Sequence, residues 1–333
     1  MNRKWMMVCL GAVLAAAVLT GCGGNGGTGN TKKPKTDTPP AATAKLGDKT
    51  VNLYEFTGES LKGKVYKVPH ILVDGDKLYM RYFGPLKEGD TEQVLTANQI
   101  LLDHETVKEV KPIPGNSNLD TPFFLSNHHV YMDNKGKDRT AWWNGKELHT
   151  AKDAMPNAFG TGEGSQVYYW GPGSKSKGKS ICRAEIVNGE IKNGKEVLAI
   201  PYKDIFGSDD QNKWIYEFSR IRADKDGFYI EMRKMVNKAK EGYKLFAFDN
   251  QGKTYCTLEN LDKEASVFAI TDNYIVMAKR TAQGGKYTVS EKKTGKSLGE
   301  FELPAAPDMI DGGAGDSVMI FAGKDEKLYR LDL

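Results

Sequence analysis

Residues 226–230 read Asp-Gly-Phe-Tyr-Ile, a two-residue turn signal followed by a short apolar strand. The pattern of this stretch recurs along the chain, which indicates a repeated fold. Five other segments share its pattern, each with Asp, Asn or Gly ahead of apolar residues: 76–80, 127–132, 164–169, 272–277 and 316–320. Their equivalent positions are Tyr79, Tyr131, Tyr168, Tyr229, Ile275 and Met319, spaced 37 to 61 residues apart. This spacing brackets the roughly 40 to 50 residues of a propeller blade, so the sequence predicts six repeated β units.

Most units also contain a second hairpin with its own turn chemistry. Asn144-Gly145 and Asn188-Gly189 each separate two apolar runs, and Asn-Gly tolerates the positive φ angles of a type I′ turn. The segments 245–253 and 287–296 follow the same plan. One unit therefore has the content of a four-stranded blade.

The two ends of this region complete each other. The last unit is short and ends at 327–333, whereas an additional strand-like stretch, 50–56, precedes the first unit. Pairing this stretch into the last blade would close the ring and remove an exposed sheet edge. The sequence therefore predicts an all-β fold over 46–333, a β-propeller of six four-stranded blades closed by its amino-terminal strand.

The amino terminus has the three-part layout of a secretory signal peptide. Arg3 and Lys4 precede an apolar run over residues 6–19, and small residues follow. This run is shorter than the roughly 20 residues that span a bilayer as a helix, which disfavours a permanent transmembrane anchor. The sequence predicts a signal peptide over 1–21.

The tetrapeptide Leu19-Thr20-Gly21-Cys22 resembles the lipobox of bacterial lipoproteins. The resemblance implies that the Cys22 thiol receives a diacylglyceryl group and that Cys22 becomes the new amino terminus. Fatty acyl chains such as palmitate would then hold the protein at a membrane, because two or more chains give stable anchoring. We therefore expect a secreted protein of the cell envelope, lipid-anchored on the extracytoplasmic side.

Residues 22–45 are rich in Gly, Thr, Pro and Lys, and are predicted to form a flexible tether. The formal net charge of the chain is +4, of which Arg3 and Lys4 contribute two. Basic and acidic residues are interspersed, so nothing indicates a nucleic-acid partner.

Segments 244–249 and 328–332 look like outer strands of propeller blades. In this respect the domain resembles the β-propellers of bacterial lipoproteins, including the quinoprotein-like propeller of the outer-membrane assembly machinery. The regular Trp-Asp, kelch and quinoprotein tryptophan signatures are absent. The resemblance implies a propeller and no particular partner.

No local motif indicates catalysis, a metal or a cofactor. His128 and His129 are adjacent and would face opposite ways on a strand. An EF-hand register on Asp224-Lys225-Asp226-Gly227 places Arg222 and Arg233 where carboxylates are required. Gly160 to Ser165 leads into a strand and does not fit a phosphate-binding loop.

Two groups of side chains remain as candidates. Aromatic residues could bind a partner; the candidates are Trp142, Trp143, Trp170 and Trp214. Because adjacent tryptophans on a strand face opposite ways, we also expect core packing for some of them. The domain also holds Cys182 and Cys256, for which a disulfide and two free thiols both remain open.

These features favour a non-catalytic binding or scaffold module with a protein or glycan partner near the envelope. The alternative is an extracytoplasmic carbohydrate-active enzyme, a glycosidase or lyase whose carboxylates come from several blades. Its sign would be acidic side chains that converge in one pocket, drawn from Asp74, Asp120, Asp224, Asp272 and Asp311.

Overall fold

The structure is a computed structural model that describes residues 38–65, 67–83, 95–117, 123–134, 139–155, 159–172, 178–201, 213–236, 239–259, 261–262, 264–265, 267–313 and 315–333. Residues 1–37 and 38–333 form two units, and the predicted signal peptide and Cys22 lie outside the described residues. In the described part, no helix has the length and hydropathy to cross a membrane.

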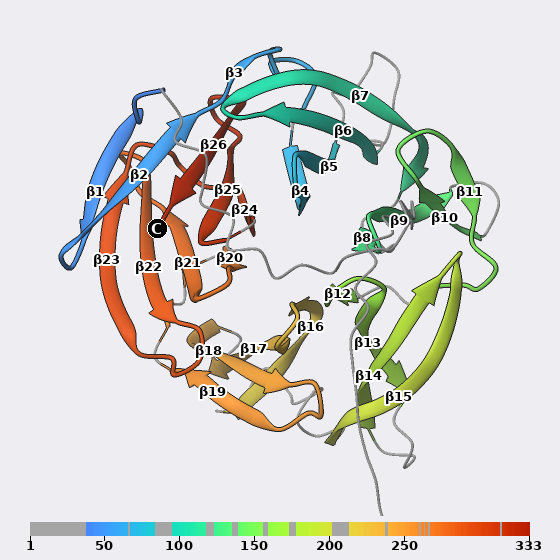
Figure 1. Cartoon of the computed structure of the whole chain (residues 1–333). Coiled ribbons are helices and arrows are strands. Elements are labelled where there is room, and N and C mark those ends of the chain that lie inside the picture. The colour runs from blue at the N-terminus through green and yellow to red at the C-terminus, as the bar shows by residue number, and fades with distance from the viewer. Residues whose placement is uncertain are drawn as a thin grey trace, which may run out of the picture. The chain divides into compact units, whose positions relative to one another are not determined.

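Residues 38–333 form six sheets, antiparallel apart from the pairing of one short strand, arranged as blades around a ring, which confirms the predicted six-bladed propeller (Figure 1). Blade 1 contains β4 (Lys67–Asp74), β5 (Lys77–Phe83), β6 (Leu95–Asp103) and β7 (Thr106–Ser117). Blade 2 contains β8 (Phe123–Ser126), β9 (His129–Asn134), β10 (Arg139–Trp143) and β11 (Leu148–Thr150). Blade 3 contains β12 (Phe159–Thr161), β13 (Gln166–Pro172), β14 (Gly178–Val187) and β15 (Glu190–Pro201).

The second half of the ring repeats this plan. Blade 4 contains β16 (Lys213–Ala223), β17 (Gly227–Val236), β18 (Ala239–Asp249) and β19 (Thr254–Leu258). Blade 5 contains β20 (Val267–Ile270), β21 (Tyr274–Arg280), β22 (Gly285–Glu291) and β23 (Ser297–Leu303). Blade 6 contains β24 (Met309–Gly312), β25 (Ser317–Ala322) and β26 (Lys327–Asp332). The first strand of each blade lies nearest the ring axis (Figure 1).

The repeated positions of the sequence lie on the second strand of every blade. Their side chains are buried, with at most 4% of their surface exposed: Tyr79, Tyr131, Tyr168, Tyr229, Ile275 and Met319. Hydrophobic clusters pack neighbouring blades together, for example Tyr168 of blade 3 with Phe228 of blade 4. The repeat is therefore an interblade packing position, which explains why it is apolar and large.

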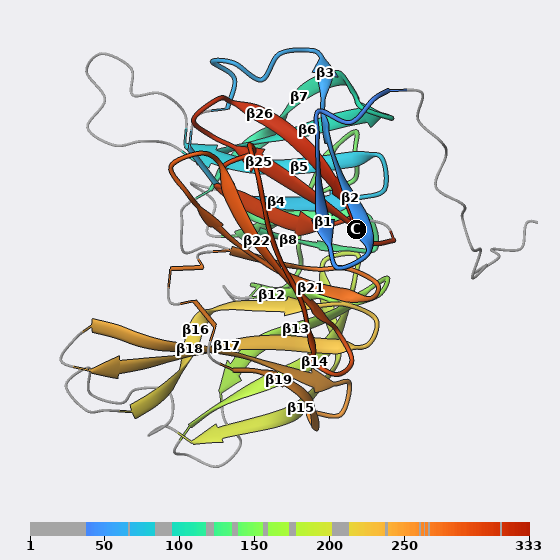
Figure 2. The same ribbon diagram turned by 90° about the vertical axis from the view of Figure 1, so that its left-hand side faces the viewer.

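The ring is closed by the amino-terminal strands. The predicted strand 50–56 is β2 (Lys49–Glu55), which pairs with β26 in the register Asn52↔Asp332 to Glu55↔Tyr329. In the side view, β1 and β2 run along the outside of the ring next to β26 (Figure 2). The pairing confirms the predicted closure.

Two strands of this segment were not predicted. Strand β1 (Ala42–Leu46) pairs with β2, so blade 6 has five strands, and residues 42–45 of the predicted tether are part of the sheet. Strand β3 (Thr57–Gly58) pairs in parallel with the outer strand β7 of blade 1. The amino-terminal segment therefore joins both blades at the closing seam.

The two Asn-Gly hairpins form as expected but use different turns. Asn188 and Gly189 have φ of 51° and 76°, as a type I′ turn requires. In the hairpin at Asn144-Gly145, only Gly145 has a positive φ. The Asn144 side-chain oxygen accepts hydrogen bonds from the backbone N–H groups of Lys146 and Glu147. That turn is stabilised by an asparagine side chain, and the predicted type I′ conformation is wrong there.

Candidate functional site

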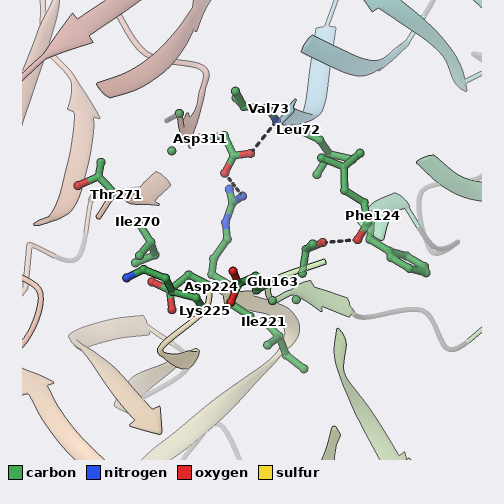
Figure 3. A pocket seen from close by; sticks show the side chains of 18 of the residues that line it. Leu72, Val73, Phe124, Glu163, Ile221, Asp224, Lys225, Ile270, Thr271 and Asp311 are labelled. Atoms are coloured by element: carbon green, nitrogen blue, oxygen red, sulfur yellow. Dashed lines mark hydrogen bonds and ion pairs between the residues drawn. The ribbon is translucent and has the colours of Figure 1, made fainter. Parts of the chain in front are cut away.

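A cavity of about 330 Å³ lies at the ring axis, where the first strand of each blade turns into the second. Each of the six blades contributes residues to it, because the ends of β4, β8, β12, β16, β20 and β24 converge there. We call the ring face that carries these six turns the first-hairpin face. Apolar side chains such as Leu72, Ile221 and Ile270 alternate with charged ones in the cavity wall (Figure 3).

An ion pair crosses this cavity. Arg222 Nη1 of β16 lies 2.8 Å from Asp311 Oδ1 of β24, and the two side chains are 22% and 19% exposed. Asp311 Oδ2 also accepts the backbone N–H of Val73 in β4 (3.3 Å). Figure 3 shows Asp311 between these partners, with Glu163 and Asp224 on the other side of the cavity. The carboxylate therefore connects blades 4, 6 and 1.

The backbone and a neighbouring ring hold Arg222 in place. Its Nη2 donates to the Ile310 carbonyl oxygen (3.3 Å), and its guanidinium lies 5.7 Å from the centre of the Phe268 ring in blade 5. Burial raises the pKa of Asp311, and Arg222 and the N–H groups of Gly312 and Val73 offset only part of this effect. A carboxyl with a raised pKa in a cavity is a feature of many functional sites.

A second charged cluster joins blades 4 and 5. The Lys292 side chain is 2% exposed, and its Nζ lies 2.9 Å from Asp224 Oδ2 and 2.7 Å from Asp226 Oδ2. Asp224 Oδ2 also accepts the hydroxyl of Tyr229 (3.1 Å), which accepts the hydroxyl of Tyr255 (2.9 Å). The ammonium group thus occupies the space between the two carboxylates.

This cluster shifts the pKa values of its members. Burial acts to lower the pKa of Lys292, but its bonds to Asp226 and Asp224 raise it overall. Burial acts to raise the pKa of Asp226, whereas Lys292 and Lys225 lower it overall. Burial is the main cause of the raised pKa of Tyr229. The cluster is therefore a charged, hydrogen-bonded contact between two blades.

The candidate acids of the enzyme hypothesis are partly brought together. Asp224, Asp272 and Asp311 line the same cavity, with Glu163 as a fourth acid that the sequence did not single out. Asp74 is elsewhere, 2.6 Å from His128 Nδ1, and Asp120 lies outside the described residues. Among the described residues, no group of three His, Cys, Asp or Glu side chains is arranged to hold a metal ion.

Two of the four candidate aromatic residues lie in the core. Trp143 and Trp170 are 2% and 6% exposed and belong to the hydrophobic core, the packing that was expected beside the binding role, so they offer little surface to a partner. Trp142 is partly buried and stacks on His149. The Trp214 side chain lies outside the described residues. Of the two histidines after Asn127, His128 is exposed and His129 half-buried; His128 lies in the turn with φ of 62° and only His129 is on β9, so a turn separates them and not the expected alternation along a strand.

The cysteines are not joined. Cys182 in β14 and Cys256 in β19 are both free thiols. Burial raises the pKa of the Cys256 thiol, and a protonated thiol is a poor nucleophile.

Sequence reasoning missed Arg222 and Lys292 as cavity residues. Their partners lie 89 and 68 residues away along the chain, in other blades. The sequence signal for Arg222 as a cavity residue was its position near the end of the first strand of blade 4, directly before the turn at 224–226.

No protein-family model matches the chain, and no curated protein matches it. It is similar in fold to the N-terminal domain of Nup159 (10% identity, TM-score 0.41, covering 80% of this chain and 76% of that one). It is also similar to BamB from Moraxella catarrhalis (12% identity, TM-score 0.38, 84% and 98% covered). A third similar structure is the computationally designed Ika8 protein (14% identity, TM-score 0.38, 79% and 70% covered). Likenesses this distant concern the fold alone and carry no argument about function.

Proposed function

We propose that this protein is a non-catalytic binding module, held by a lipid on Cys22 at the extracytoplasmic side of an envelope membrane. In this proposal the first-hairpin face receives a protein or glycan partner. One observation carries the proposal: the first strands of all six blades line one cavity together with turn residues of blades 3 to 6, and Glu163, Lys225 and Asp272 are exposed at its rim. Loops that a rigid scaffold gathers at one place are a common location for binding.

The charges inside the cavity also favour binding over catalysis. Asp311 is paired with Arg222, and Asp224 is paired with Lys292. Carboxylates engaged in this way are held in a fixed position and can accept further hydrogen bonds from a ligand. The exposed charges at the rim, of which Lys225 also lies 3.3 Å from Asp226, would affect the rate at which a partner associates.

The experiment is affinity capture of partners from envelope extract with the full-length protein in detergent. Glu163→Lys and Lys225→Glu change the rim of the cavity. Lys324→Glu is the matched control: Lys324 is exposed in the turn between β25 and β26, at the opposite end of β25 from the first-hairpin face. A partner lost with the rim variants and kept with Lys324→Glu supports the proposal. A partner retained by all three variants places binding elsewhere.

The anchor needs its own test, because Cys22 lies outside the described residues. Metabolic labelling with an alkyne fatty acid should label the natural protein and leave Cys22→Ala unlabelled. Cys182→Ala is the control for the loss of a thiol. Label that persists in Cys22→Ala would contradict the lipid anchor.

A carbohydrate-active enzyme is the second candidate. The convergence of Asp224, Asp272 and Asp311 in one cavity favours it, and so does the raised pKa of Asp311, because a general acid must hold its proton. Turnover of envelope polysaccharides that Asp311→Asn abolishes, while binding persists, would establish the enzyme and overturn the non-catalytic proposal.

A further inference from the structure

Two imidazole rings flank the indole of Trp142 on one face of blade 2. The His149 ring, from the neighbouring strand β11, lies 4.2 Å from Trp142 between ring centres, at an interplanar angle of 21°. The His129 ring, from β9 on the other side, lies 4.6 Å away at 30°. The three side chains come from three adjacent strands, and His149 pairs directly opposite Trp142.

The hydrogen bond between Asn144 and His149 has only one possible direction, with His149 as the acceptor. Asn144 Oδ1 accepts the backbone N–H groups of Lys146 and Glu147, at 2.8 Å each. The amide group is therefore oriented, and its Nδ2 faces His149 Nε2 at 3.0 Å. Since an amide nitrogen only donates, Nε2 must accept, which requires the neutral imidazole. Protonation would place two donors against each other.

The second histidine is also disfavoured as a cation. Burial lowers the pKa of His129, and the charges of His128 and His149 lower it further; Asp74 acts in the opposite direction. Asp74 is itself engaged by His128 at 2.6 Å. On the turn side, Lys146 and Glu147 are exposed and carry opposite charges.

We propose that the His129–Trp142–His149 stack is an acid-sensitive element, which keeps the turn between β10 and β11 and the edge strand β11 ordered at neutral pH and releases them on acidification. Protonation of His149 breaks its bond to Asn144, and two charged imidazoles on either side of one indole repel each other. Strand β11 has only three residues, pairs with β10 alone and lies at the blade edge, so loss of this contact should affect its order.

The sign of the pH dependence follows from the neutral forms. A histidine whose pKa is lower in the folded state takes up its proton preferentially on unfolding. This applies to His129, whose pKa is lowered: its contribution is present above the unfolded pKa of about 6.5 and is lost as the pH falls through the folded value. Local order at β11 should decrease in mildly acidic buffer.

Hydrogen–deuterium exchange of the full-length protein in detergent, corrected for the intrinsic pH dependence of exchange, tests this. We expect residues 148–150 to exchange severalfold faster at pH 5.0 than at pH 7.5. His129→Gln with His149→Gln should remove the difference. His104→Asn, at an exposed histidine in the turn between β6 and β7, is the control and should keep it.

A second variant covers the case in which the double variant fails to fold. Asn144→Asp keeps an acceptor for the two backbone N–H groups and presents a carboxylate to a protonated His149. Acidification should then leave residues 148–150 protected. Equal pH dependence in the natural protein and in Asn144→Asp, or no pH dependence in the natural protein, would overturn the proposal.

Discussion

Arg222 and Asp311 form an ion pair in the axial cavity, with Nη1 and Oδ1 2.8 Å apart and each side chain about one-fifth exposed. They belong to blades 4 and 6, and Asp311 reaches blade 1 through the backbone N–H of Val73. A partly buried ion pair does not by itself imply stability, because desolvation of both charges opposes their attraction. Substitution of these two residues therefore tests whether the ion pair contributes to the free energy of unfolding or leaves it unchanged.

The first prediction separates the two partners. Arg222→Met leaves the Asp311 carboxylate without its cation, and we expect the free energy of unfolding to fall by about 3 kcal/mol. Arg222→Met combined with Asp311→Leu removes both charges and should recover most of that loss. Denaturant titration of each variant measures the values. If the double variant is as unstable as the single one, the ion pair is a net stabilising contact.

The second prediction concerns pH. Because burial raises the pKa of Asp311, its contribution to stability is present below the unfolded value of about 3.9 and is lost as the pH rises through the folded value. The stability of the natural protein relative to Asp311→Asn should therefore decrease as the pH rises above about 3.9. Asp226→Asn should show a pH dependence of stability of the opposite sign, because the pKa of Asp226 is lowered. Relative to that variant, the natural protein should gain stability as the pH rises from strongly acidic values. Melting temperatures across this range measure both.

The third prediction concerns Lys292. Lys292→Met leaves Asp224 and Asp226 adjacent without the ammonium between them, and we expect a loss of about 3 kcal/mol. Lys293→Met is the control, since Lys293 is the exposed neighbour and should change stability by less than about 0.5 kcal/mol. Similar melting temperatures for the two variants would contradict the structural role of Lys292.

The fourth prediction tests the closing seam at Gly58. This residue has φ of +91°, and a Cβ atom there would lie 2.4 Å from the Val107 carbonyl oxygen. Gly58→Ala should cost about 2 kcal/mol through strain and a displaced β3. Gly63→Ala is matched, because Gly63 also has a positive φ (+71°) but has open space around it. The difference between the two melting temperatures measures the close approach alone, and equal losses would show that β3 does not hold the seam.

The sequence predicted blade number and closure because both depend on local patterns. Tyr79 and its equivalents stand after turn residues, 37 to 61 residues apart, and each is buried. Strand β1 was missed because Ala42 to Leu46 alternate between exposed and half-buried positions, with only Leu46 buried. An outer strand of this kind carries little hydrophobic signal.

The site was harder to predict, for a physical reason. Arg222 and Asp311 become neighbours only when six units close around an axis, so no spacing in the sequence relates them. Among the tryptophans, the candidate Trp143 proved to be a core residue. It donates its indole N–H to Gln99 Oε1 at 2.9 Å and is buried. A large aromatic residue with a satisfied polar group fits a core as well as it fits a binding face.

The pairing of β2 with β26 also determines the order in which the ring is assembled. Residues 52–55 meet 329–332, so β2 leaves the ribosome long before its partner and must wait for it. A contact between such distant segments forms slowly because a long loop has to close first. Until β26 arrives, the edges of β2 and β25 are open to pairing with other chains. Folding of the ring therefore depends on protection of these two unpaired edges, and residues 329–332 control when that dependence ends.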